Sequence, residues 1–213
     1  MNARCETNTL DKVKCEAAAV FIFQDPKILE RQVSYFGKTL GAKLQAAVAL
    51  KDFTGKRGEI LAVYTESAIP SPRLVLVGIG EAEKISLEIF RRAAAGAATK
   101  AQSMKAASLA FQFPLLEHLP ASLKNSSADV AQAIVEGAGL SLYKYDKYLT
   151  ENIEKKKLES LIFFIQDKKD VNEIQKGLRA GEILCAAVCH ARDLENAPSN
   201  ELYPETLALK PCA

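Results

Sequence analysis

The alternation of short apolar runs with stretches of helical spacing is the feature that most limits how this chain can fold. Apolar residues at spacings of three and four predict helices, and the segments concerned are 28–50, 87–105, 127–142 and 171–192. Short apolar runs bounded by Gly, Pro or charged residues predict strands, with those at Ala17–Phe23 and Leu74–Gly80 predicted to be buried. The other predicted strands are Glu59–Thr65, Ala107–Phe113 and Leu158–Asp167. Because such strands need helices on both faces, the sequence predicts an α/β three-layer sandwich with a central mixed sheet.

Two of the predicted helices carry signals for where they begin or break. Gly37 and Gly41 lie within 28–50 and predict breaks there, since glycine is a poor residue for a helix interior. Ser86 precedes the Ala-rich segment and is predicted to be its N-cap. The final stretch, from Asp193 onward, contains three prolines and differs in character from what precedes it.

Composition and charge limit the classes of partner and the compartment. The 213 residues carry a formal net charge of only +2, which gives no general reason to expect a nucleic acid or a membrane as partner. No stretch approaches the roughly 20 apolar residues of a membrane span, and the start lacks the apolar run of a secretory signal. The odd number and irregular spacing of the cysteines argue against a disulfide framework and favour a reducing cytoplasm; they are Cys5, Cys15, Cys185, Cys189 and Cys212.

A glycine turn after an apolar strand is the first candidate for a binding site. Gly78 and Gly80 end a predicted strand, where backbone N–H groups at a helix N-terminus attract phosphate. Glu83 occupies the place of the third glycine, and Glu81 adds a second negative charge. We therefore interpret the segment as a tight structural turn.

A sulfur-rich helix is the second candidate. Cys185 and Cys189 share one helix face, but His190 is rotated about 100° from Cys189. His118, the only other histidine, lies between two prolines in a predicted loop, and nothing marks either histidine as a catalytic base. We interpret the cysteines as small core side chains and predict no catalytic, cofactor-binding or metal-binding residue in this chain.

An aromatic and basic segment is the third candidate. Tyr143–Tyr148 alternates tyrosines with lysines, and Lys155–Lys157 follows, a pattern that can bind single-stranded nucleic acid. Asp146, Glu151 and Glu154 dilute the charge. An exposed connection or an oligomer contact is the preferred interpretation.

Several segments, in order along the chain, resemble the cytosolic leucyl aminopeptidase family. DFTGKRGEILAVYT and RLVLVGIGEAEKISLEIFRRAAAGAA resemble strands, a turn and a helix of its amino-terminal domain, and VAQAIVEGAGLSLYKYDKYLT resembles its helix and Tyr/Phe-Asp-x-Tyr segment. Tyr203 stands where the family usually has Thr, and 210–213 departs from the family's helix. The most specific similarity is in GEILCAAVCHARDLENAPSNELYPETLA, at Ala191, Arg192, Asp193, Leu194, Asn196, Pro198, Asn200, Pro204 and Glu205.

The resemblance implies a metallo-aminopeptidase, a hydrolase that removes N-terminal amino acids from peptides during intracellular protein turnover. Two divalent metal ions (zinc, manganese or magnesium) would lie in a carboxy-terminal catalytic domain. Its ligands lie partly in the motif NTDAEGRL, which this sequence lacks. We therefore expect no cofactor in this chain and no activity from it alone.

The resemblance also implies a domain organisation and partners. We expect an amino-terminal, macro-domain-like domain over 1–167, a connecting helix over 168–191 and a truncated start of the catalytic domain over 192–213. The expected partners are the catalytic domain, peptide substrate through it, and further copies in a hexamer. Two other function classes stay open: a macro-like module that binds a nucleotide or ADP-ribose near Gly78–Glu83, and an assembly or DNA-contacting domain.

Overall fold

A six-stranded sheet forms the centre of the computed structural model, which describes residues 2–34, 36–114, 119–124, 126–151, 157–165 and 168–209. The strand order is β1-β6-β5-β2-β4-β3. All neighbouring strands run parallel except β3, which pairs antiparallel with β4. The strands are β1 (Asn2–Thr7), β2 (Ala17–Phe23), β3 (Ile60–Tyr64), β4 (Arg73–Gly80), β5 (Ser108–Gln112) and β6 (Ser160–Ile165). The sheet is therefore mixed, as predicted.

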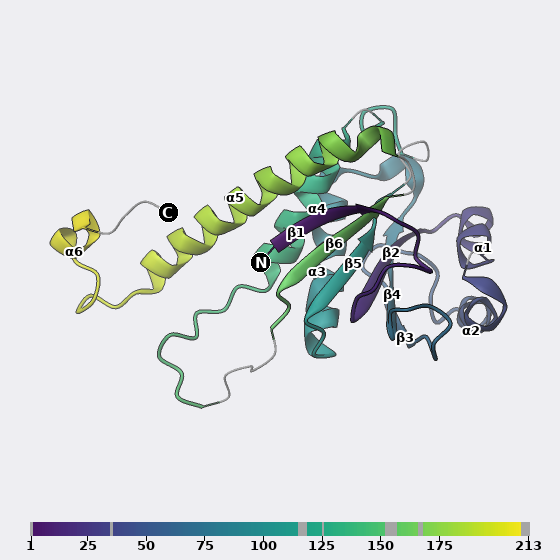
Figure 1. Cartoon of the computed structure of the whole chain (residues 1–213), viewed down its shortest axis with the longest axis horizontal. Helices are drawn as coiled ribbons and strands as arrows, with labels where there is room; N and C mark the ends of the chain where they lie inside the picture. The colour runs from purple at the N-terminus through teal and green to yellow at the C-terminus, as the bar shows by residue number, and fades with distance from the viewer. Residues whose placement is uncertain are drawn as a thin grey trace.

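Helices cover both faces of this sheet (Figure 1). Side chains of α1 and α2 pack on one face, and those of α3, α4 and α5 belong to the core on the other. The α/β three-layer fold is thus confirmed. The helices are α1 (Pro26–Ser34), α2 (Gly37–Ala49), α3 (Leu87–Ser103), α4 (Ser127–Ser141), α5 (Val171–Asn196) and α6 (Pro204–Leu209), with short 3-10 turns at Ala82–Lys84 and Lys168–Asp170.

The alternation of side chains along the strands divides the core into two. Phe21, Phe111 and Phe163 point to the α3–α4 face, and their neighbours Ile22, Ala110 and Ile162 point to the α1–α2 face. The ring centroids of Phe111 lie 5.7 Å from Phe21 and 5.6 Å from Phe163. This aromatic row crosses three adjacent strands and fixes their register.

The first strand was missed by the sequence analysis. β1 reads NARCET, and its outer positions are exposed because it lies at the edge of the sheet beside β6. Because a polar edge strand contains no apolar run, the sequence pattern did not predict it. It is held at the edge by β6 and by α5, whose Glu182 Oε1 accepts a hydrogen bond from the Ala3 N–H at 2.5 Å.

The single helix predicted over 28–50 is two helices, α1 and α2. Gly37 begins α2, but the predicted break at Gly41 is wrong, since Gly41 lies inside that helix. A Cβ at Gly41 would stand 3.3 Å from the Val33 carbonyl oxygen. The glycine therefore allows the two helices to approach each other rather than breaking one of them.

The other helix ends differ more modestly from expectation. Ser86 occupies the N-cap position of α3, but its side chain makes no capping hydrogen bond. α5 continues to Asn196, so the boundary predicted between 191 and 192 falls within a continuous helix. The domain limits themselves remain a prediction.

Across the described residues, no helix combines the length and apolar character needed to cross a bilayer.

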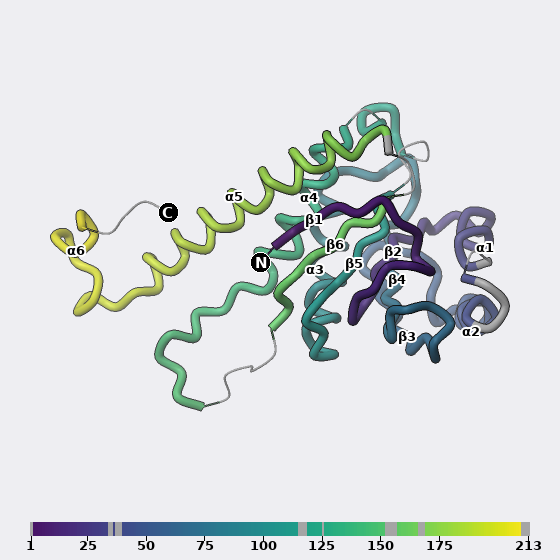
Figure 2. Tube along the Cα trace, in the orientation of Figure 1, coloured from purple at the N-terminus to yellow at the C-terminus, as the bar shows by residue number. Residues whose placement is uncertain are grey.

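The distal half of α5 extends away from the sheet, and α6 lies beyond it (Figure 2). The loop that follows α4 extends in the same direction, and its described parts are residues 142–151 and 157–159. Long-range contacts join this loop to the end of α5: the Tyr143 hydroxyl donates to Asp193 Oδ1 at 2.8 Å.

Candidate functional site

The glycine turn after β4 is closed by the protein itself. The Gly78 N–H donates to the Glu59 carbonyl at 2.8 Å, and the Gly80 N–H donates to the Gly55 carbonyl at 2.9 Å. A Cβ at Gly78 would lie 2.0 Å from the carbonyl oxygen of Lys56. The two glycines thus let the 53–59 loop lie against the end of β4, and their N–H groups are already used.

A carboxylate already occupies the loop beside this turn. Glu59 Oε2 accepts hydrogen bonds from the Thr54 N–H at 2.7 Å and the Lys56 N–H at 3.2 Å, and the Thr54 hydroxyl lies 2.9 Å from Oε1. Burial alone would raise the pKa of Glu59, but the hydrogen bonds from Thr54 and Lys56 outweigh it and lower the pKa below its ordinary value. The Glu59 carboxylate thus accepts hydrogen bonds from the backbone N–H groups of Thr54 and Lys56, which a bound phosphate would need as donors.

The segment after the turn also lacks the geometry of a phosphate loop. Gly80 is followed by the three-residue 3-10 turn Ala82–Lys84, and α3 begins only at Leu87. Glu81 pairs with Lys84 at 2.8 Å on the surface. The geometry therefore favours a structural turn. Glu59 was not singled out from the sequence, although an acidic residue directly after Gly58, in a turn that also contains Gly55, was a usable signal.

We expect Gly78→Ala to destabilise the domain by about 2 kcal/mol, because the new methyl group would overlap the backbone of the 53–59 loop. Urea denaturation measures the loss. Glu81→Gln serves as the control, since that side chain is exposed, and it should change the free energy of unfolding by less than about 0.5 kcal/mol. A fully stable Gly78→Ala variant would mean that the loop does not lie against β4.

Glu59 predicts a pH dependence of stability. Because its pKa is lowered in the folded state, the ionised carboxylate stabilises the fold above the unfolded-state pKa of about 4.5. This contribution is lost as the pH falls through the lower, folded-state pKa. Urea denaturation between pH 6 and pH 3 should show Glu59→Gln to be less stable by about 1 kcal/mol at pH 6, with the difference shrinking as the pH falls below about 4.5. A constant difference between the variants would contradict the assignment.

Cys185 of α5 is packed in the core rather than placed for chemistry. Cys185 is buried, and its thiol donates to the carbonyl oxygen of Val135 in α4 at 3.6 Å. Burial, with the nearby Cys189 and Glu136, raises the pKa of Cys185 to about 11. A thiol that stays protonated is a poor metal ligand and a poor nucleophile. Among the residues that the structure describes, no three His, Cys, Asp or Glu side chains gather closely enough to hold a metal ion.

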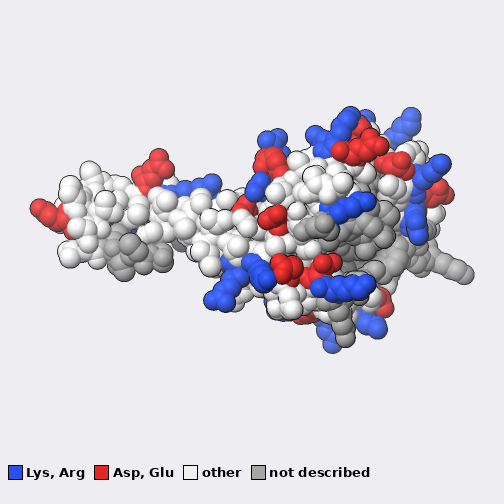
Figure 3. Space-filling model, turned by 90° about the horizontal axis from the view of Figure 1, so that it is seen from above, with Lys and Arg blue, Asp and Glu red and all other residues white. Residues whose placement is uncertain are grey.

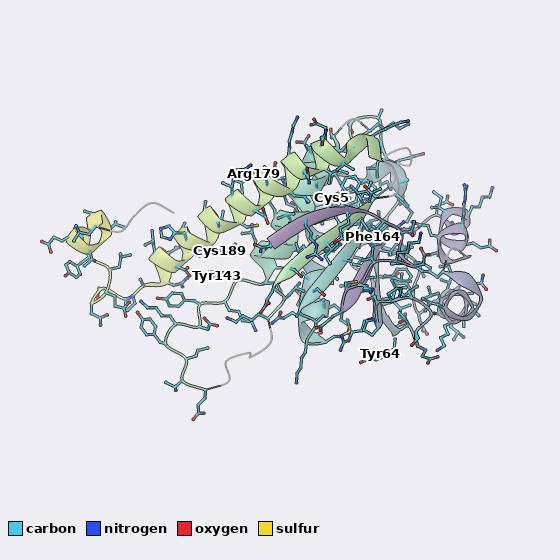
Figure 4. All side chains as sticks on the ribbon, viewed as in Figure 1. Cys5, Tyr64, Tyr143, Phe164, Arg179 and Cys189 are labelled. Carbon is cyan, nitrogen blue, oxygen red and sulfur yellow. The ribbon has the colours of Figure 1, made fainter. Side chains whose placement is uncertain are left out.

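Cys189 and His190 instead line a cavity of about 820 Å³ between the end of α5 and the loop after α4. Figure 4 shows Tyr143 and Cys189 next to each other at this position. Asp193 accepts the hydrogen bond from the Tyr143 hydroxyl, and the Arg192 guanidinium lies 5.3 Å from the centroid of the Tyr143 ring. Partial burial and the bond to Asp193 raise the pKa of Tyr143. His118 lies outside the described residues.

Two of the lysines that suggested nucleic acid, Lys147 and Lys157, have acidic partners. Lys157 Nζ lies 2.6 Å from Asp146 Oδ2, and this hydrogen bond and charge lower the pKa of Asp146. Lys147 pairs with Glu201, which lies beyond α5. Lys155 and Lys156 lie outside the described residues. The segment Tyr143–Tyr148 therefore ties the loop to the end of α5, a pairing of distant segments that spacing along the sequence cannot predict.

Comparison with known proteins places the chain in a family. Residues 19–152 match the sequence profile of the cytosol aminopeptidase family, N-terminal domain. A probable cytosol aminopeptidase from Chlorobaculum parvum is 34% identical, over 91% of this chain and 39% of its own length. One from Alkaliphilus oremlandii is 26% identical over 99% of this chain and 41% of its own length. The chain thus spans about two fifths of the length of these curated relatives.

Solved structures agree on the fold. A leucine aminopeptidase variant from tomato matches 98% of this chain and 41% of its own with a TM-score of 0.75, at 23% identity. The bottromycin maturation enzyme BotP, in a structure with Mn, matches 91% of this chain and 34% of its own with a TM-score of 0.61, at 25% identity. With the profile match over residues 19–152, these similarities identify the chain as a member of the cytosol aminopeptidase family that carries its N-terminal domain.

Proposed function

We propose that this chain acts as the non-catalytic N-terminal domain of an aminopeptidase that removes N-terminal amino acids, leucine among them, from peptides in the cytoplasm. The observation that carries the proposal is the match of residues 19–152 to the family's N-terminal domain, with relatives similar over almost the whole chain. Those relatives are named cytosol aminopeptidases, which supports the reaction and the compartment.

The metal ions of the reaction would be held outside the residues described for this chain. BotP, a structural neighbour, was solved in complex with Mn, which supports a metal-dependent reaction for the family. In this chain, the best sulfur candidate, Cys185, is a buried and protonated thiol. The described residues do not fit a divalent metal centre, so no step of the reaction is assigned to them. Two ions of zinc, manganese or magnesium remain the expectation for the whole enzyme.

Assembly is the role that the domain itself would have. Its partners would be the catalytic part of the enzyme and further copies of the protein, a hexamer being the expectation. A nucleotide-binding or ADP-ribose-binding role has less support, because Glu59 and the 53–59 loop occupy the only glycine turn that suggested it. A DNA-contacting role also has less support, because Lys147 and Lys157 are paired with carboxylates.

A chimera tests this proposal. This chain replaces the matching N-terminal two fifths of the Chlorobaculum parvum relative, and hydrolysis of a leucine anilide is measured with Mn²⁺. We expect turnover within about tenfold of the unmodified relative, because a domain of the same fold should support the same catalytic part. The relative without its N-terminal two fifths is the control. A folded, metal-loaded chimera with no turnover would contradict the proposed function.

A further inference from the structure

β3 forms one edge of the sheet, and no strand of the described residues pairs with its outer side (Figure 1). Its five residues, ILAVY, have only aliphatic and aromatic side chains. None of the five is buried, whereas all seven residues of β2 are buried. Ile60 is 38% exposed and Tyr64 is 69% exposed. An apolar edge strand of this kind is a ready template for pairing with another strand.

The opposite edge of the same sheet is protected against such pairing. β1 carries the charged residues Arg4 and Glu6, which form an ion pair at 2.8 Å. The Ala3 N–H already donates to the Glu182 carboxylate of α5. Charged side chains of both signs are also spread over the main body of the molecule (Figure 3), but β3 contains none. Because charged residues are a common protection of edge strands, their absence from β3 indicates that this edge is used for contact.

The pairing of β3 with β4 shows which backbone groups of β3 point outward. The Thr65 N–H donates to the Pro72 carbonyl at 3.1 Å, so Thr65 faces β4. Because hydrogen-bonded positions alternate along an antiparallel strand, positions 61 and 63 also face β4. The intervening residues direct their N–H and C=O groups away from the sheet, and these groups have no hydrogen-bond partner among the described residues: Ile60, Ala62 and Tyr64.

The strand is self-complementary about Ala62. We infer that β3 pairs with β3 of a second copy of this chain, antiparallel and across a two-fold axis at Ala62. In this register Ala62 faces the partner's Ala62, Ile60 faces the partner's Tyr64, and every outward N–H and C=O group of the strand is paired. A register shifted by two residues would leave some of these groups unpaired. The two sheets would thus become one continuous sheet.

The side chains favour the same register. Ile60 lies on the α3 face of the sheet, because its Cδ1 would stand 2.7 Å from a Cβ at Gly96 of α3. Alternate residues of a strand share a face, so Tyr64 lies on that face as well. In the paired strands, Ile60 would therefore contact the partner's Tyr64. An aromatic side chain opposite a β-branched one is a favourable cross-strand pair.

This pairing gives the proposed assembly role a surface, and in that respect it rests on the proposed function. The strand contact itself can be measured in this chain alone. A strand of five residues buries little area, so the isolated chain should dimerise weakly, with a Kd of about 10–100 μM. In a larger assembly, other contacts would raise the effective concentration of the two strands and stabilise the pair.

Register-specific cross-linking tests the pairing. Chains with Ile60→Cys and chains with Tyr64→Cys are mixed near the expected Kd and oxidised with diamide, and peptide mass spectrometry identifies the disulfides. Both side chains are exposed, so the variants should stay folded. Opposed positions would have Cα atoms about 5.5 Å apart, which suits a disulfide. Identical positions would lie about 13 Å apart or more. We therefore expect the 60–64 disulfide in the mixture at least tenfold faster than a 60–60 or 64–64 disulfide in either chain alone.

Sedimentation velocity provides a second readout. Tyr64→Lys should weaken dimerisation at least tenfold, because it places a charge on the edge strand and removes the aromatic contact. Figure 4 shows Tyr64 away from α5. Tyr203→Lys is the matched control, since Tyr203 is 44% exposed beside α6, at the far end of the molecule from β3, and it should leave the dimer unchanged.

Three results would overturn the inference. The first is a mixture in which the 60–64 disulfide forms no faster than the disulfides between identical positions. The second is a chain that stays monomeric at ten times the expected Kd. The third is a dimer that Tyr203→Lys dissociates and Tyr64→Lys does not. An inactive chimera together with an intact 60–64 disulfide would instead refute the proposed function and leave the strand pairing in place.

Discussion

Gly137→Ala is expected to lower the free energy of unfolding by about 3 kcal/mol, the upper range for overpacking a tight contact. Gly137 lies in α4, and a Cβ there would stand 2.0 Å from the carbonyl oxygen of Arg91 and 2.7 Å from its carbonyl carbon. These are backbone atoms of α3, so no side chain can rotate to make room. Relief requires that α3 and α4 move apart, which would open the core beneath Phe90 and Ile134.

Gly96→Ala is the matched control for this prediction. Gly96 lies in α3, and the close atom that its Cβ would meet is Ile60 Cδ1 at 2.7 Å, the end of a flexible side chain. The gain in helix propensity, about 1 kcal/mol, should offset the crowding. Urea denaturation followed by circular dichroism compares the two variants. Equal stability of Gly137→Ala and Gly96→Ala would contradict the close approach of α3 and α4.

Phe111→Ala is expected to destabilise the domain by about 3–5 kcal/mol. The side chain is fully buried in the middle strand of the aromatic row, and its removal would leave a cavity between the rings of Phe21 and Phe163. The variant should unfold at a much lower urea concentration. Phe111→Leu, which keeps most of the volume, should cost less than about 2 kcal/mol. A small effect of Phe111→Ala would mean that β5 is not central to the core.

Strands β2, β3 and β4 were predictable because each is an apolar run with clear ends. β2 matches its predicted range, and β3 and β4 differ from theirs by a single residue at one or both ends. β1 could not be found in this way, since NARCET owes its place to pairing with β6 from the far end of the domain. The strand order depends on such long-range pairs, which local patterns do not encode.

The glycine turn after β4 shows how much of a candidate site can be predicted from the sequence. The missing third glycine and the neighbouring Glu81 and Glu83 pointed to a structural turn, which the geometry favours. The spacing of residues along the sequence could not show why this turn is closed. The carboxylate of Glu59 and the backbone of Lys56 lie beside the turn only because β3 pairs with β4.

α5 illustrates the same limit in a helix. The sequence predicted a helix in which Cys185 and Cys189 are core side chains. The structure confirms the helix and the burial of Cys185, but the prediction is wrong for Cys189, which is half-buried and lines the cavity. The periodicity did not show which apolar residues of α5 are buried, such as Leu178, and which are exposed, such as Ile183. The hydrogen bond between Tyr143 and Asp193 joins residues 50 positions apart, so the sequence gave no indication that these two residues pair.

The most direct test of the account is an assay of the purified chain for leucine anilide hydrolysis, with Mn²⁺ and with Zn²⁺, beside a measurement of bound metal by mass spectrometry. We predict background turnover and far less than one metal ion per chain, because the described residues gather no set of ligands for one. Metal-dependent turnover with stoichiometric bound metal would contradict the account, and Cys185, Cys189 and His190 would then be the first residues to substitute.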